Sequence, residues 1–161
     1  MKDPLVIANF FIEKGNEIGD PITQMKIQKL VYIAHGWYLS LTDKPLIRAK
    51  VQAWKFGPVI PEIYQALKKY GNDPVPVSIT NESINDQEIV DFLNIIWDLY
   101  GKYSASFLSN LTHQKSSPWD LTAQRYGYDV PPNMIIDNED IKHHYNPIVK
   151  KFNDTLKATP A

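Results

Sequence analysis

Apolar side chains recur at helical spacing over much of the chain, most clearly in residues 24–41, QMKIQKLVYIAHGWYLSL. Thr23 is a suitable N-cap, and Asp43 to Pro45 supplies the stop, because a residue before proline disfavours helical geometry. The stripe is too wide for a helix covered on one side only, so we expect the remaining elements to pack around it. Its members are Ile27, Leu30, Val31, Ala34, Trp37, Tyr38 and Leu41.

Six further segments show helical periodicity or helix-capping signals. The predicted helices are residues 4–15, about 61–70, about 86–100, a short one after Ser104, one opened by Ser117 and Pro118, and a last one capped by Asp137. Ser-Pro at a helix start, with Asp120 three residues after the cap, predicts a capping box. The fold class is therefore mainly α, a compact domain of about six or seven helices. We expect one domain over residues 1–161, with its core in about 5–150 and a short C-terminal tail.

A minor β element is predicted at about residues 46–56, as one strand or as a two-stranded ribbon. Alternation places Val51 and Ala53 on one face, and Trp54 and Phe56 on the other, before Gly57 and Pro58 end the run. Residues 75–79 are a second candidate, as a short edge strand.

Composition limits the function classes. With 17 basic and 18 acidic residues the net charge is −1, and no long run of either sign offers a surface for nucleic acid. The absence of Cys excludes disulfides, thiol nucleophiles and thiolate metal sites. No window is apolar enough for a membrane span, and the N-terminus predicts an amphipathic helix instead of a signal peptide. We expect a cytoplasmic protein with neither a nucleic-acid nor a membrane partner.

The polar residues point to no enzyme, metal or cofactor. His35 is expected to be a packed or surface residue, and adjacent His143 and His144 diverge by about 100° on a helix. Phosphate-binding glycine motifs and nucleophile motifs are absent. Lys26 and Lys29, like Lys68 and Lys69, are expected on solvated faces.

Five residues are candidates for binding a partner. Trp54, Phe56 and Pro58 form either part of the core or an exposed anchor patch. His113 and Trp119 flank the turn between two helices, where His113 either caps the preceding carbonyls or takes part in recognition.

Three strings together resemble one family. KIQKLVYIAHGWYLSL, AWKFGPVIPEIYQALKKYG and THQKSSPW are similar to motifs of the Panacea domain, found in SocA-like antitoxins and phage-associated proteins. The resemblance covers about residues 5–150. It implies a mostly helical domain that neutralises a protein toxin, which we expect to be co-encoded, by direct contact. SocA-like members are adapters that deliver their toxin to a ClpXP protease, so a protease component is a second implied partner. Leu30, Leu39 and Gly57 are matching positions that we assign to the fold.

The leading hypothesis is therefore a non-enzymatic antitoxin that occludes its toxin. A proteolytic adapter is the alternative. A hydrolase or transferase with a dispersed site is the third, and it would require His113 close to a carboxylate and a hydroxyl.

Overall fold

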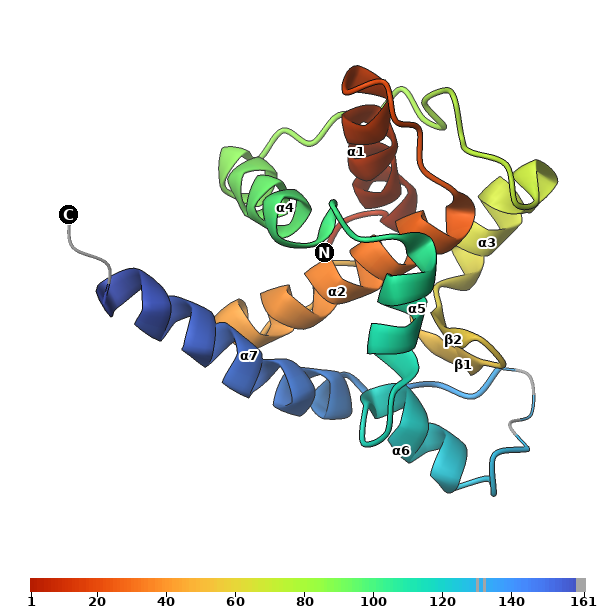
Figure 1. Cartoon of the computed structure of the whole chain (residues 1–161), viewed down its shortest axis with the longest axis vertical. Helices are drawn as coiled ribbons and strands as arrows, with labels where there is room; N and C mark the ends of the chain where they lie inside the picture. The colour runs from red at the N-terminus through yellow and green to blue at the C-terminus, as the bar shows by residue number, and fades with distance from the viewer. Residues whose placement is uncertain (130, 132, 159–161) are drawn as a thin grey trace.

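The computed structural model describes residues 1–129, 131 and 133–158. Figure 1 shows a mainly α fold in which helices surround a central helix, with one small hairpin at the side. The elements are α1 (Pro4–Glu17), α2 (Gln24–Thr42), β1 (Gln52–Trp54), β2 (Gly57–Val59), α3 (Pro61–Leu67), the 3₁₀ turn η1 (Lys68–Tyr70), α4 (Gln87–Tyr100), α5 (Ala105–His113), α6 (Pro118–Gln124) and α7 (Asn138–Ala158). The predicted fold class is confirmed. None of the helices in the described ranges is both long and apolar enough to cross a bilayer.

Helix α2 is the element around which the others are arranged. Every residue from Lys26 to Trp37 is buried, and α2 contacts α1, α3, α4, α5, α7 and β2. Thr23 caps its start and Asp43, in the left-handed conformation, ends it, as the sequence predicts. Leu41, predicted in the buried stripe, is 47% exposed and lies in the last turn of α2, where Thr42 and Asp43 are exposed too.

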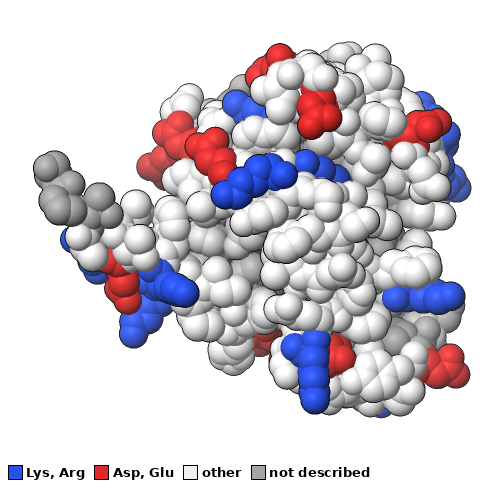
Figure 2. Space-filling view, viewed as in Figure 1, with Lys and Arg blue, Asp and Glu red and all other residues white. Residues whose placement is uncertain are grey.

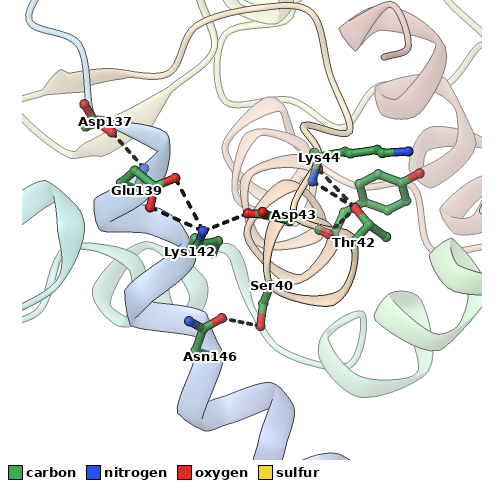
Figure 3. Close-up of polar contacts among 9 residues, drawn as sticks. Ser40, Thr42, Asp43, Lys44, Asp137, Glu139, Lys142 and Asn146 are labelled. Atoms are coloured by element: carbon green, nitrogen blue, oxygen red, sulfur yellow. Dashed lines mark hydrogen bonds and ion pairs between the residues drawn. The ribbon is translucent and has the colours of Figure 1, made fainter.

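Helix α7 crosses α2 closely at a glycine. A Cβ on Gly36 would lie 2.2 Å from Cδ2 of Tyr145, so only glycine admits the Tyr145 ring at this crossing. Beyond it, Ser40 Oγ donates to Asn146 Oδ1 at 2.7 Å (Figure 3). Phe152 lies 5.3 Å from Trp37 between ring centroids. Helix α7 therefore continues through Ala158, and Phe152 packs on α2.

The hairpin pairs Gln52 with Val59, Ala53 with Pro58, and Trp54 with Gly57. The ribbon alternative is therefore correct: β1 lies within the predicted range of 46–56, but β2 lies just after it. Gly57 and Pro58 do not end the β element; they begin its second strand. Gly57 has φ of 117°, which an L side chain rarely adopts, so it permits the tight turn.

Three other features of the backbone differ from the sequence prediction. Gly15 lies inside α1, which continues through Glu17. Residues 75–79 form no strand in the described structure; instead Pro74 bridges to Thr23, next to a bond from Val75 N–H to the Ile22 carbonyl. Segment 134–136 extends the hairpin on its other side, since Ala53 N–H donates to the Met134 carbonyl at 2.8 Å and Ile136 N–H donates to the Val51 carbonyl at 2.9 Å.

Candidate partner-binding groove

The β1–β2 hairpin is held from one side by helices α5 and α6. Trp119 Nε1 of α6 donates to the Trp54 carbonyl at 2.6 Å. Ser109 Oγ of α5 donates to the Phe56 carbonyl at 3.1 Å. These two side chains bind carbonyls at both ends of the loop between the strands, so they fix the turn.

Helix α2 holds the following part of the hairpin. Lys29 Nζ donates to the Pro58 carbonyl at 2.9 Å. Gln28 makes a two-way contact with Ile60, because its Oε1 accepts from Ile60 N–H at 2.9 Å and its Nε2 donates to the Ile60 carbonyl at 3.0 Å. Alternate carbonyls along residues 54–60 are thus all bound by side chains from three helices.

The predicted alternation of β1 decides which aromatic rings face outward. Val51 and Ala53 are buried. Trp54 is half-buried, with its ring 4.8 Å from that of Tyr64 between centroids, and Phe56 is 64% exposed. Trp54 and Phe56 therefore present aromatic surface on the outer side of a fixed hairpin.

This outer side borders a cavity of about 520 Å³, which we call the hairpin groove. Its lining comes from the first turns of α2, the hairpin, α3, the turn after η1 and the start of α5. The lining residues are Thr23, Gln24, Met25, Gln28, Lys29, Trp54, Lys55, Phe56, Val59, Tyr64, Gly71, Asn72 and Ala105. Figure 2 shows few charged side chains in the middle of the viewed face, over α5, and most of them around its edge.

Two lysines that the sequence places on a solvated face are buried. Lys29 is 3% exposed and Lys26 is 9% exposed. Burial lowers the pKa of Lys29 to about 8 and also lowers the pKa of Lys26. The prediction was wrong because α2 is buried all round between Lys26 and Trp37, so even its polar positions there point into the protein. Lys68 and Lys69 are exposed, as expected.

The corner between α5 and α6 supports the hairpin from behind. His113 Nδ1 contacts the Ser109 carbonyl, and its ring lies 5.4 Å from that of Trp119 between centroids. A Cβ on Gly57 would lie 3.5 Å from His113 Nδ1. The described contacts of His113 include neither a carboxylate nor a side-chain hydroxyl, which the dispersed-site enzyme hypothesis requires.

Asp120 orders this corner in a different way from the one predicted. Ser117 Oγ caps α6 by accepting from Asp120 N–H, but the Asp120 carboxylate accepts from Ser116 N–H at 2.8 Å instead of returning to Ser117. Tyr128 also donates to this carboxylate, at 3.0 Å. Chiefly because of the bond from Ser116, the pKa of Asp120 is lowered. The capping box is therefore incomplete, and the carboxylate instead stabilises the turn before the helix.

The five predicted partner-binding residues lie around one hairpin. Trp54 and Phe56 line the groove, whereas Pro58 is buried and binds Lys29 through its carbonyl. His113 and Trp119 are half-buried behind the hairpin.

Apart from Trp54 and Phe56, sequence reasoning missed the residues that line the groove, among them Met25, Gln28, Lys29 and Tyr64. The sequence does contain a signal for the burial of Gln28 and Lys29. A central helix covered on every side must also bury the polar residues next to its apolar stripe, and buried polar residues need hydrogen-bond partners.

The remaining polar groups offer little for metal chemistry. Across the part of the chain that the structure describes, no three His, Cys, Asp or Glu side chains gather as metal ligands. Buried His35 uses Nε2 to contact Asn138 Oδ1 at 3.0 Å, which confirms its packed position and orients α7 on α2. The groove has the composition of a binding surface, because apolar walls surround a few polar groups at fixed positions.

A mainly helical fold with an open apolar groove beside a fixed hairpin defines a class of binding domain. The chain belongs to the family described as antitoxin SocA-like, Panacea domain, whose model matches residues 27–120. That range includes the hairpin, the α5–α6 corner and Lys29, whereas Lys26 lies just before it. Antitoxin SocA of Caulobacter vibrioides (strain NA1000 / CB15N) is 28% identical over 179 residues, covering 98% of this chain and 93% of that protein. No solved structure gave a significant match.

Proposed function

We propose that this protein is an antitoxin that neutralises a protein toxin by direct contact, and that the hairpin groove is the contact surface. The observation that carries the proposal is the outward display of Trp54 and Phe56 on a hairpin whose carbonyls are held by α2, α5 and α6. Membership of the SocA-like antitoxin family supports the kind of partner.

The physical basis is preorganisation. Aromatic anchors at a surface contribute most when they are rigid before binding, because little side-chain or loop entropy is then lost. Trp54 is braced by Tyr64, and Trp119 binds its carbonyl. A stable complex would bury about 800 Å² on each partner, so the contact extends beyond the groove itself.

The test uses the purified toxin, which we expect to be encoded beside this protein, and its in vitro activity. Wild-type protein should inhibit the toxin at stoichiometric concentration without any further component. Trp54→Ala should weaken binding by about 2 kcal/mol or more, as expected for a central aromatic anchor. Tyr126→Ala is the matched control, because Tyr126 is also an exposed aromatic residue, 44% accessible, but does not line the groove; it should bind like wild type.

Two results would contradict this proposal, the first its contact surface and the second its direct neutralisation. One is that Trp54→Ala and Tyr126→Ala bind the toxin equally well. The other is a complex in which the toxin stays active until a ClpXP-type protease is added. The second result would favour the proteolytic adapter, which shortens the lifetime of the toxin instead of blocking its site.

A further inference from the structure

We propose that the hairpin groove binds a toxin segment in which an aspartate or glutamate side chain stands beside an apolar one, and that the Lys29 ammonium pairs with that carboxylate. This rests on the proposed function, since it takes the groove to be the toxin site. It adds the chemistry of the bound segment and assigns Lys29 the role of recognising it.

The position of Lys29 is the first support. Its side chain is among those lining the groove, yet it is 3% exposed, so it lies at the groove floor. An ammonium has three N–H donors, and the described structure uses one, to the Pro58 carbonyl at 2.9 Å. A Cβ on Gly57 would lie 3.1 Å from Nζ, so the ammonium lies close against the hairpin backbone.

The charges around the groove are the second support. The described residues contain ion pairs that involve Arg48, Arg125 and Lys142, and none of them involves Lys29. The groove lining contains two lysines, Lys29 and Lys55, and neither Asp nor Glu. The groove is therefore positive at its floor and on its wall, and it complements an anionic group on the partner.

The energetics give a reason for such a partner group. A buried ammonium without a counter-ion is costly, and here desolvation lowers the pKa of Lys29 to about 8. Lys26 is also buried, but its Nζ donates to the Gly101 carbonyl at 2.5 Å. The negative charge of Asp20 also stabilises its protonated form and partly offsets the lowering of its pKa by burial. An incoming carboxylate would supply for Lys29 the negative charge that the protein itself does not place there.

The apolar residues on the walls of the groove indicate that the bound segment also carries an apolar side chain. Met25 is 40% exposed and Phe56 is 64% exposed, and both lie on the groove with Trp54. A nucleic acid fits less well, because two lysines in a protein of net charge −1 provide few phosphate contacts. A polypeptide with neighbouring acidic and apolar side chains matches both features.

Three synthetic tripeptides test the inference without requiring the toxin. They are acetyl-Phe-Asp-Phe-amide, its Asn analogue acetyl-Phe-Asn-Phe-amide, and acetyl-Phe-Asn-Phe with a free C-terminal carboxylate. Binding is followed by Trp fluorescence and by the NMR chemical shift of ¹³Cε in Lys29. The Asp peptide should bind wild-type protein at least tenfold more tightly than the Asn amide, and its binding should shift the Lys29 signal.

Variants locate the effect. Lys29→Met should reduce the preference for Asp over Asn to less than twofold while the Asn amide still binds. Lys26→Met, which replaces the other buried lysine of α2, should keep the tenfold preference. If Lys29→Met fails to fold, the comparison of Asp with Asn on wild-type protein and the Lys29 signal still decide the question.

Each outcome has one meaning. Equal binding of the Asp and Asn amides, or an unmoved Lys29 signal, overturns the inference. A preference for the peptide with the free C-terminus over the Asp amide also overturns it, because the carboxylate would then come from a chain end. If the peptides show no Asp preference but Trp54→Ala still loses the toxin, only this inference fails. If the toxin binds elsewhere while the Asp preference is present, the groove is not the toxin site, and only the pairing of Lys29 with a carboxylate is retained.

Discussion

The two ends of α2 face different surroundings. At its C-terminal half α7 packs against the helix, and charged side chains pair there: Lys142 Nζ lies 2.7 Å from Asp43 Oδ1 and 3.3 Å from Glu139 Oε2 (Figure 3). At its N-terminal end the hairpin groove remains open, and Lys29 is buried without a carboxylate. We call these regions the α7 interface and the hairpin groove.

We interpret this difference as two roles of α2: one end stabilises the fold, and the other borders the surface that we propose binds the toxin. The α7 interface is complementary in shape, as the close approach of Gly36 to the Tyr145 ring shows, so it contributes to stability. The hairpin groove is open, and under the proposed function it is the surface that binds the partner. Breaking the first should therefore unfold the protein, whereas changing the second should alter binding more than stability.

The largest expected effect is at the α7 interface. Gly36→Ala places a methyl group against the Tyr145 ring, at a distance of 2.2 Å before relaxation, and should destabilise the fold by about 3 kcal/mol through overpacking. Urea denaturation measures the change. In a Tyr145→Ala background the same substitution should cost far less, because the clash is gone and alanine favours a helix by about 1 kcal/mol over glycine. Equal costs in both backgrounds would show that Tyr145 does not set this crossing.

The next effect concerns Lys29 and pH. Its pKa is about 8 in the folded protein against 10.5 for the free side chain, so between these values the unfolded chain binds the proton that the folded chain has lost. Stability should therefore rise as pH increases from about 8 to 10.5, by about 3 kcal/mol for this group. The test is the difference between wild type and Lys29→Met, measured by urea denaturation across this window, since other titrating groups are common to both. A difference that is constant with pH would show that Lys29 is not desolvated.

A third prediction separates stability from binding at Trp54. The side chain is half-buried and rests on Tyr64, so Trp54→Ala should lower the free energy of unfolding by only about 1 kcal/mol, less than removal of a fully buried ring. Its loss of toxin affinity should be larger, as proposed above. Thermal melting and titration calorimetry on the same sample compare the two. A variant that unfolds would place Trp54 in the core instead of at the contact surface.

The smallest effect is expected from the ion pair at the α7 interface. Lys142 and Asp43 meet at 2.7 Å in solvent, where screening and side-chain entropy offset most of the attraction. Lys142→Met should leave the urea midpoint unchanged within experimental error at moderate salt. A clear loss of stability would mean that the charges at this interface contribute more than its shape.

Local signals were sufficient to predict the helices. Caps at Thr23, Asp86, Ser104 and Ser117 act on backbone within three residues, and all four begin helices as expected. Alternation, which is also a local signal, placed Trp54 and Phe56 on one face of the strand, but it left open whether that face is core or surface.

The missed features depend on chain segments far apart in sequence. Lys29 is buried because the hairpin and α5 fold over α2, and its bond to Pro58 spans 29 residues. Gly57 and Pro58 were predicted to end a strand because Gly-Pro usually does, but pairing with β1 overrides that preference. Tyr64 becomes part of the groove only because its ring meets Trp54.

The most direct measurement is site-specific photo-crosslinking to the toxin. A benzophenone amino acid is placed at Phe56 in the groove or at His143, an exposed position on α7. The account predicts a crosslinked complex from position 56 and none from position 143. Crosslinking from position 143 with none from position 56 would contradict the central claim that the hairpin groove is the surface that binds the toxin.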